Sequence, residues 1–178
     1  MREPGTLSRF LPDAQATRRA GAALARALAA LDTPETTPLR SSAPGLSGPF
    51  VTLAGELGTG KTTLVRGLLA DLGVPGPVRS PTFTLLESYA AGARQVDHLD
   101  WYRLSGAVDL EALDFRELLG AGHWVLVEWP ERVPAAAAAA DLALRLRYEG
   151  SGRRLEVVPM SDRGRRMLAA LQADKTLG

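Results

Sequence analysis

The stretch LAGELGTGKTTLVRGLL (53–69) limits the possible folds of this chain more than any other part of the sequence. The short apolar run FVTLA (50–54) leads into it and is typical of a buried strand. The residues from about 60 to 72 are typical of a helix, which Gly73 and Pro75 would end. A strand that passes through a glycine loop directly into a helix predicts an α/β fold.

The loop GELGTGKT (55–62) matches the pattern G-x-x-x-x-G-K-[ST] without a gap. Glycines leave no Cβ in the way, so backbone N–H groups can turn toward phosphate oxygens, and the start of the next helix adds partial positive charge. A chance match among 18 glycines is the alternative, but the strand before the loop and the helix after it argue against that. The predicted ATP-binding residues are those of the loop and the residue after it: Gly55, Glu56, Leu57, Gly58, Thr59, Gly60, Lys61, Thr62 and Thr63.

Two side chains of this loop have distinct predicted roles. Lys61 and Lys175 are the only lysines among the 21 lysines and arginines of the chain. A compact, mobile ammonium can follow the β- and γ-phosphates of ATP in a way that a planar guanidinium cannot. We therefore expect Lys61 to contact these phosphates and the hydroxyl of Thr62 to bind Mg²⁺.

Strands and helices follow one another along the rest of the chain, and two pairs of strands are typical of hairpins. The predicted fold class is therefore α/β: a P-loop NTPase-like mixed sheet with a parallel centre and antiparallel strands, flanked by helices. We expect a single domain, 1–178, with a Pro/Ser-rich loop at 32–49 inside it. Further helices are predicted at 12–31, 108–119 and 161–173, and further strands at 82–89, 94–102, 123–129, 141–149 and 153–159.

Glu128 ends the apolar run HWVLVE, at the place where P-loop proteins carry an acidic residue near the metal. It is a candidate catalytic residue and a candidate Mg²⁺ ligand. The alternative is a strand-end carboxylate that faces solvent. Trp129 follows it and should point to the other face of the strand, so packing in the core is the expectation for this side chain.

Asp100 lies in HLDWYR, an apolar and aromatic setting in which an unpaired carboxylate is costly. It is the second candidate catalytic residue, and the alternative is an ion pair with Arg103. His98 falls on the same strand face as Asp100. It either orients that carboxylate or packs in the interior.

The segment RSPTFT (79–84) gathers hydroxyl groups around a proline. Ser80, Pro81 and Thr82 form a candidate switch loop that would sense the γ-phosphate. The alternative is the start of a strand with ordinary hydroxyl side chains.

Composition points to a protein without a strong attraction to membranes or nucleic acid. The net charge is +1, the chain has no cysteine, and no apolar run approaches the roughly 18 residues that a membrane helix needs. We expect a cytoplasmic protein with no membrane partner. Arginines cluster at 18–19, 153–154 and 163–166, where a solvated surface explains them as well as direct contact with tRNA does.

Five motifs, in order, resemble the TsaE family, formerly called YjeE, of small P-loop ATPases. They are LPDAQAT, GELGTGKTT, SPTFTLLESY, HLDWYRL and LVEWPE, and the resemblance covers about residues 11–158. It implies a protein that binds ATP and Mg²⁺ and hydrolyses ATP weakly alone. It also implies work with the TsaB–TsaD complex, which attaches threonylcarbamoyl to adenosine 37 of tRNAs that read ANN codons. Hydrolysis would reset that complex between turnovers, so contact with tRNA is expected to be indirect.

The resemblance also implies roles for single residues. Lys61 matches the phosphate lysine, Thr62 and Glu128 match the Mg²⁺ ligands, and Asp100 matches the acid that activates or positions water. Residues 80–82 match the switch-like loop. Asp13 and Thr17, in LPDAQAT, match a segment near the nucleotide base, and Arg153 is a further candidate for nucleotide contact.

Two other functions stay open at this point. One is a small-molecule or nucleotide kinase, against which the chain shows no arginine-rich lid and no obvious acceptor pocket. The other is a nucleotide-binding adaptor with negligible catalysis. The fate of the γ-phosphate would distinguish the three. A kinase transfers it to an acceptor, an ATPase releases it as free phosphate, and an adaptor binds ATP without either reaction.

Overall fold

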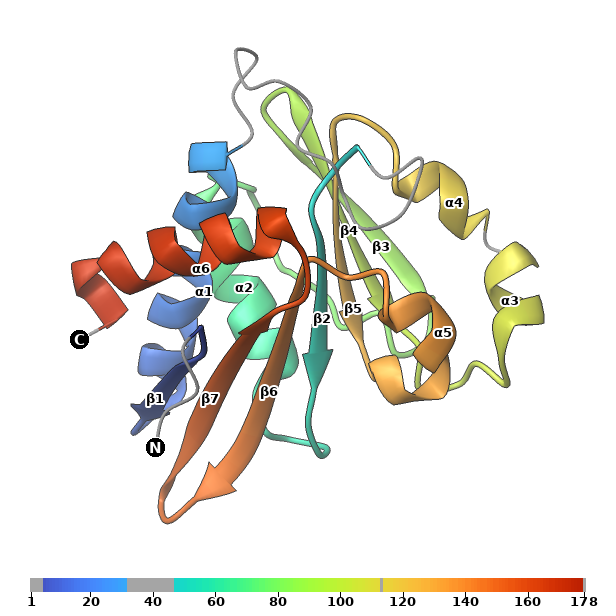
Figure 1. Ribbon diagram of the computed structural model, residues 1–178. Helices are drawn as coiled ribbons and strands as arrows, with labels where there is room; N and C mark the ends of the chain where they lie inside the picture. The colour runs from blue at the N-terminus through green and yellow to red at the C-terminus, as the bar shows by residue number, and fades with distance from the viewer. Residues whose placement is uncertain (1–4, 32–46, 113, 178) are drawn as a thin grey trace.

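The computed structural model describes residues 5–31, 47–112 and 114–177. Its centre is a seven-stranded sheet in the order β1-β7-β6-β2-β5-β4-β3 (Figure 1). The central strands β6, β2, β5 and β4 are parallel to one another, whereas β1, β7 and β3 join the sheet in antiparallel pairs. The predicted mixed sheet is thereby confirmed. The strands are β1 (Leu7–Leu11), β2 (Phe50–Ala54), β3 (Leu86–Ala91), β4 (Arg94–Asp100), β5 (His123–Glu128), β6 (Leu142–Glu149) and β7 (Gly152–Pro159).

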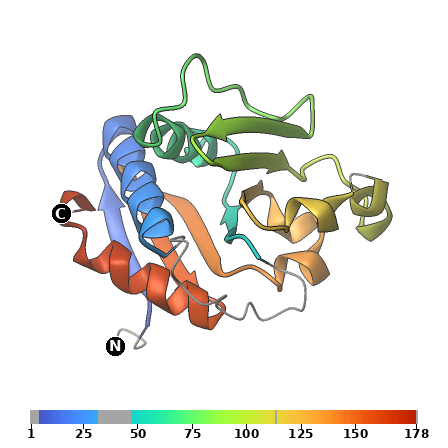
Figure 2. The same cartoon turned by 90° about the horizontal axis from the view of Figure 1, so that it is seen from above.

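Helices cover both faces of the sheet (Figures 1 and 2). The long helices α1, α2 and α6 pack on one face, and the short helices α3, α4 and α5 contribute to a second cluster on the other. The helices are α1 (Ala14–Leu31), α2 (Lys61–Asp71), α3 (Ala107–Ala112), α4 (Phe115–Leu118), α5 (Pro134–Ala137) and α6 (Asp162–Ala173), with 3₁₀ turns η1 (Pro130–Arg132) and η2 (Lys175–Leu177).

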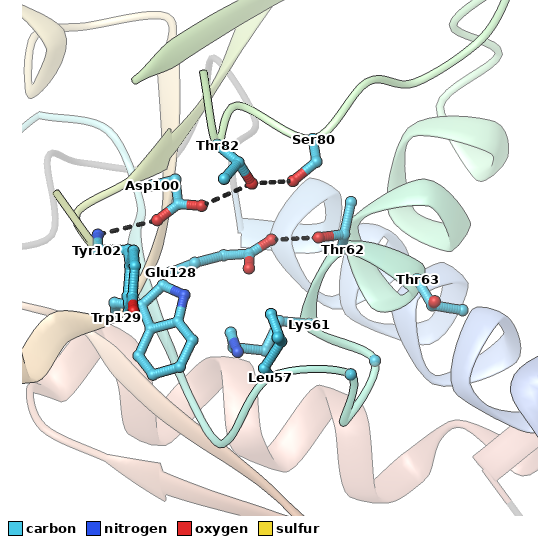
Figure 3. A pocket seen from close by; sticks show the side chains of 12 residues that line it. Leu57, Lys61, Thr62, Thr63, Ser80, Thr82, Asp100, Tyr102, Glu128 and Trp129 are labelled. Carbon is cyan, nitrogen blue, oxygen red and sulfur yellow. Dashed lines mark hydrogen bonds between the residues drawn. The ribbon is translucent and has the colours of Figure 1, made fainter. Parts of the chain in front are cut away.

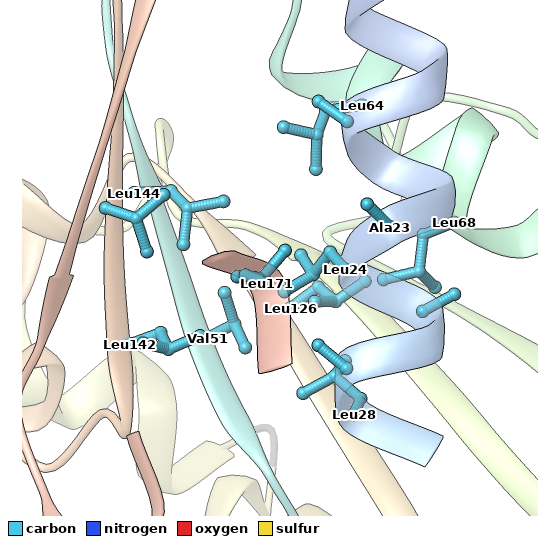
Figure 4. Packing of buried hydrophobic residues seen from close by; sticks show 14 of the residues in the cluster. Ala23, Leu24, Leu28, Val51, Leu64, Leu68, Leu126, Leu142, Leu144 and Leu171 are labelled. Atoms are coloured by element: carbon cyan, nitrogen blue, oxygen red, sulfur yellow. The ribbon is translucent and has the colours of Figure 1, made fainter. Parts of the chain in front are cut away.

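Alternation along the central strands divides the core into two clusters. On β5, Leu126 faces the cluster under α1 and α2, whereas Val125 and Val127 face the cluster under the short helices. On β2, Val51 faces the cluster under α1 and α2, and Phe50 faces the cluster under the short helices. Figure 4 shows the first cluster, in which leucines of α1 and α2 meet the sheet. Because both faces are buried, the central strands have the near-continuous apolar sequences expected of a parallel sheet.

Two predicted elements have different bounds in the structure. The strand predicted at 82–89 begins only at Leu86, because the residues before it form a turn in which Leu85 N–H donates to Pro81 at 2.7 Å. Leu85 has φ +65°, which lies outside the β region that regular strand residues adopt. The helix predicted at 108–119 is divided into α3 and α4, and Asp114 before α4 has φ +48°, which ends helical geometry there.

Strand β1 was not predicted from the sequence. It pairs antiparallel with β7, from Leu7 opposite Val157 to Leu11 opposite Arg153. Leu7 and Leu11 are buried, but Arg9 between them is polar and Phe10 is exposed. The alternation in this short segment is therefore too weak to identify a strand without its partner.

The predicted Pro/Ser-rich loop falls mostly outside the described residues, at 32–46. Its last part leads into β2, where the Arg163 guanidinium donates to the carbonyl oxygens of Ser47 and Gly48 at 3.1 and 2.6 Å. The single-domain organisation stays a prediction. None of the helices within the described ranges is long and apolar enough to cross a membrane.

Arg26 of α1 ties the end of α2 to the C-terminal segment. Its guanidinium donates to Asp71 at 2.6 Å, to Asp174 at 2.9 Å and to Thr176 at 2.8 Å. The hydrogen bond from Arg26 is the main cause that lowers the pKa of Asp174 from 3.8 to about 2. Part of the stability of this corner should therefore depend on the ionised form of Asp174.

The Asp174→Asn variant should be about 1 kcal/mol less stable than the parent protein at pH 7. The pKa shift alone corresponds to about 2.5 kcal/mol, and solvent screening of this partly exposed pair reduces that value. Because the folded pKa lies below the unfolded one, the stabilisation is complete above about pH 5 and is progressively lost as the pH falls to 2 and below. Urea unfolding at pH 7 and near pH 2 checks this, and equal stability of the two proteins at pH 7 would contradict it.

Candidate functional site

The glycine loop connects β2 to α2, as the sequence predicts. Gly55, Gly58 and Gly60 have φ values of +144°, +79° and +105°, which L side chains rarely adopt. Space is also short, because a Cβ on Gly55 would lie 2.3 Å from the carbonyl oxygen of Leu146. The glycines of the pattern are therefore required by the backbone conformation itself.

Lys61 opens α2 and turns its side chain back over the loop. It is 4% exposed, and its Nζ donates to the carbonyl oxygens of Gly55 at 2.7 Å and Glu56 at 3.0 Å. The same ammonium lies 4.0 Å from the centre of the Trp129 ring. Burial lowers the pKa of Lys61, and the nearby carboxylates, above all Glu128, partly oppose this. The loop thus holds a buried cation at its centre.

A cavity of about 330 Å³ opens beside this lysine (Figure 3). Its walls come from the glycine loop, from the segment before β3 and from the carboxyl ends of β4 and β5. Strand register explains why these ends meet, since Leu53 pairs with Glu128 and Glu128 pairs with Asp100. The lining residues are Leu57, Gly58, Gly60, Lys61, Thr62, Thr63, Ser80, Thr82, Asp100, Tyr102, Glu128 and Trp129.

Glu128 is 3% exposed and lies at the end of β5, next to the start of α2. Its Oε1 accepts a hydrogen bond from the Thr62 hydroxyl at 2.7 Å and lies 3.0 Å from His98 Nε2. Burial by itself would raise the pKa of Glu128, but the contacts from His98 and Thr62 and the charge of Lys61 outweigh burial and lower it. Glu128 is therefore held as a carboxylate that faces the cavity, and it is not the solvent-facing residue of the alternative interpretation.

Asp100 is also 3% exposed, and both of its oxygens accept hydrogen bonds. The Thr82 hydroxyl donates to Oδ2 at 3.1 Å, and the backbone N–H of Tyr102 donates to Oδ1 at 2.9 Å (Figure 3). Arg103, the ion-pair partner of the alternative interpretation, lies over the ring of Phe83 instead. Asp100 therefore lines the cavity, and Thr82 links it to the segment before β3.

The predicted switch loop adjoins Asp100. Ser80 and Thr82 share a hydrogen bond of 2.8 Å, and Thr82 continues the chain of contacts to Asp100. Ser80 and Thr82 line the cavity, while Pro81 accepts the bond that closes the turn before β3. The structure thus places these hydroxyls at the cavity and in a turn, rather than in a strand.

The structure brings Thr17 and Arg153 together beside the glycine loop. Arg153 Nη1 donates to Thr17 Oγ1 at 2.8 Å, and a Cβ on Gly60 would lie 3.3 Å from Thr17 and 3.7 Å from Arg153. Asp13 caps α1 by accepting from the N–H of Ala16 at 2.6 Å. Thr17 and Arg153 thus lie beside Gly60, and none of the three residues lines the cavity.

Residues 11–155 match a family model described as "Threonylcarbamoyl adenosine biosynthesis protein TsaE". The chain belongs to the TsaE family. A relative from Haemophilus influenzae, named tRNA threonylcarbamoyladenosine biosynthesis protein TsaE, is 31% identical over 165 residues, which cover 93% of this chain and 97% of that one. A relative of the same name from Streptomyces coelicolor is 46% identical over 103 residues, or 56% of this chain and 69% of that one.

A solved structure has a similar fold. The crystal structure of Bacillus subtilis YdiB aligns with a TM-score of 0.66 over 94% of each chain, at 22% sequence identity. The TsaE family model extends from the end of β1 to the middle of β7. It therefore includes every residue of the cavity described above.

Tyr102 and Trp129 line the cavity of this TsaE family member and were not predicted to do so. Trp129 does not continue the alternation of β5, because the strand ends at Glu128 and Trp129 takes φ +61°. Its ring lies 5.0 Å from that of Tyr102, and it also packs against the second core cluster, as the sequence predicts. Position was the available signal, since Trp129 comes directly after β5 and Tyr102 comes two residues after β4, at the carboxyl ends of parallel strands where ligand sites gather.

Proposed function

We propose that this chain binds ATP with Mg²⁺ in the cavity and hydrolyses it. One observation carries the proposal: a glycine loop with a buried lysine faces two buried carboxylates at the ends of neighbouring strands. The backbone N–H groups of the loop and the start of α2 would hold the phosphates. Lys61 would leave the carbonyl oxygens of Gly55 and Glu56 for the β- and γ-phosphates.

The donor atoms at the cavity suit Mg²⁺, which prefers oxygen ligands and retains waters and substrate phosphates. The hydroxyl of Thr62 and the carboxylate of Glu128 are 2.7 Å apart, so one ion could be held by both. No group of three or more His, Cys, Asp or Glu side chains in the described ranges could bind a metal by itself. This agrees with a site that substrate phosphates complete. When bound, the ion would offset the negative charge on the phosphates.

The acidic side chains would act on the water that attacks the γ-phosphate. Glu128 and Asp100 lie side by side in the register of β4 and β5, and both line the cavity. Thr82, which donates to Asp100, would couple the state of the γ-phosphate to the segment before β3. Such an arrangement favours hydrolysis, in which catalysis depends on position and charge.

We further propose that hydrolysis serves threonylcarbamoylation of adenosine 37 in tRNAs that read ANN codons. The family description and the names of the relatives support the pathway. The TsaB–TsaD complex would be the partner, ATP hydrolysis to ADP would reset it between turnovers, and tRNA would be contacted indirectly. A cytoplasmic location follows from such a role. Phosphate release measured with and without TsaB–TsaD tests the partnership, and no stimulation by the complex would contradict it.

The variants Asp100→Asn and Glu128→Gln should each reduce phosphate release by about 100-fold while ATP still binds, because each removes one negative group from the attacking water. The exposed Glu117→Gln is the matched control and should retain full activity. Radiolabelled ATP with candidate acceptors distinguishes a kinase, which transfers the label, from an ATPase. If both variants bind ATP and support tRNA modification as well as the parent does, the protein is an adaptor and hydrolysis is not its function.

A further inference from the structure

The two oxygens of Glu128 differ in their contacts. Thr62 and His98 both approach Oε1, at 2.7 and 3.0 Å, from α2 and β4. Among the residues that the structure describes, no hydrogen bond reaches Oε2. Figure 3 shows this second oxygen turned away from Thr62 at the cavity. By contrast, both oxygens of Asp100 are occupied, by Thr82 and Tyr102.

His98 is fully buried, and its contact with Glu128 shows which ring nitrogen carries a proton. A carboxylate only accepts hydrogen bonds, so the imidazole must donate from Nε2 to Glu128. The other nitrogen, Nδ1, is buried and has no hydrogen-bond partner in the described part of the chain. A buried polar ring with one unpartnered nitrogen costs stability that a leucine at this position would not cost. Packing alone therefore does not explain a histidine here.

We propose that His98 is a positioning residue that holds Oε1 of Glu128 and thereby presents Oε2 to the cavity. The inference rests on the proposed function of the site. Thr62 is the other donor to Oε1, and it would turn to Mg²⁺ when nucleotide binds. His98 then remains as the contact that keeps the carboxylate oriented. Such outer contacts to metal-site carboxylates commonly change affinity or activity by about 10- to 100-fold when removed.

This arrangement assigns different tasks to the two acids. Oε2 of Glu128 accepts no hydrogen bond from the described residues and has its full acceptor capacity for a water molecule in the cavity. Each oxygen of Asp100 already accepts one bond, Oδ2 from Thr82 before β3 and Oδ1 from the backbone N–H of Tyr102. Glu128 would thus offer water an oxygen that no other group holds, whereas Asp100 would act on water while it also links the switch loop to the site. His98 contacts Glu128 of β5 and not Asp100, although Asp100 falls on the same face of β4 as His98.

Three variants of His98 test the inference through a difference in kcat. Glutamine places an amide N–H near the position of Nε2, asparagine is too short to do so, and leucine fills the space without a donor. We expect His98→Gln to keep kcat for phosphate release within about threefold of the parent. His98→Asn and His98→Leu should lose about 10- to 100-fold in kcat, with KM for ATP changed less than threefold. Equal kcat for Gln and Asn, or full activity of Leu, would overturn the proposal, and the Gln–Asn comparison still decides if Leu does not fold.

Two further measurements do not require hydrolysis. Long-range ¹H–¹⁵N spectra of the parent protein should show a proton on Nε2 of His98, and an Nε2 without a proton would overturn the inference. Binding of a non-hydrolysable ATP analogue should gain less affinity from Mg²⁺ in the Asn variant than in the Gln variant. If the parent protein binds the analogue with Mg²⁺ but releases no phosphate, the proposed hydrolysis fails. The spectra, and the difference between the Gln and Asn variants in the affinity gained from Mg²⁺, still decide the role of His98.

Discussion

Replacing Lys61 by alanine should weaken ATP binding by about 10- to 100-fold, which corresponds to the roughly 1.5–3 kcal/mol of a charge-assisted hydrogen bond. The lysine is 4% exposed, so its charge acts on the cavity with little screening by water. Its present partners, the carbonyl oxygens of Gly55 and Glu56, belong to the loop that would surround the phosphates. Titration calorimetry with a non-hydrolysable analogue and Mg²⁺ measures the effect.

The chain offers a matched control, because its other lysine, Lys175, is exposed in η2. Lys175→Ala should bind ATP as the parent does. Lys61→Arg should also lose most of the affinity, since the Trp129 ring lies 4.0 Å from the ammonium and leaves little room for a guanidinium. Thermal unfolding shows whether each variant is folded. Unchanged affinity in folded Lys61→Ala would mean that the glycine loop does not bind phosphate.

The parts of the site that could be predicted from the sequence are those in which local chemistry is sufficient. The left-handed conformations of Gly55, Gly58 and Gly60 admit few residues other than glycine, so the pattern follows from the backbone. Strand β2 has the predicted bounds, because five mostly apolar residues, four of them buried, next to a glycine have few other interpretations. Glu128 was found since it ends an apolar run, which is where acids near a metal lie in this class of fold.

The remaining features depend on contacts between distant segments. His98 was expected either to orient Asp100 or to pack, but the parallel pairing of β4 with β5 brings it to Glu128. Glu128 is the neighbour of His98 because β4 lies beside β5 in the sheet, and no local sequence pattern indicates this strand order. Leu85 and Trp129 take left-handed conformations that their residue types do not indicate. Tertiary contacts stabilise these conformations, so the start of β3 and the direction of Trp129 were missed.

Two glycines, one in each helix, allow α1 and α2 to cross at close range. Replacing one of them should strongly reduce the stability of the protein. A Cβ on Gly67 of α2 would lie 2.0 Å from the carbonyl oxygen of Arg18 in α1. A Cβ on Gly21 of α1 would lie 1.9 Å from the carbonyl oxygen of Leu64 in α2. Each glycine thus faces the backbone of the other helix, and a carbonyl group cannot move aside as the end of a side chain can.

Gly67→Ala should destabilise the protein by about 3 kcal/mol or more. Helix propensity alone predicts the opposite sign, since alanine is about 1 kcal/mol better than glycine inside a helix. The contact with the backbone of α1 should outweigh this gain in helix propensity, because inserting atoms into a filled interior usually costs about 1–3 kcal/mol even where side chains can adjust. Denaturant unfolding measures the change, and Ala70→Val, which adds bulk to the exposed face of the same helix, should cost less than about 1 kcal/mol.

The same substitution should also reduce ATP binding, because the two helices carry different parts of the site. Helix α2 begins with Lys61, and α1 carries Thr17, which lies beside Gly60 together with Arg153. Separating the helices moves Thr17 away from the loop, so binding should fall in the part of the Gly67→Ala protein that remains folded. If that variant is as stable as the parent or more so, propensity outweighs the contact, and the close crossing of α1 and α2 is wrong.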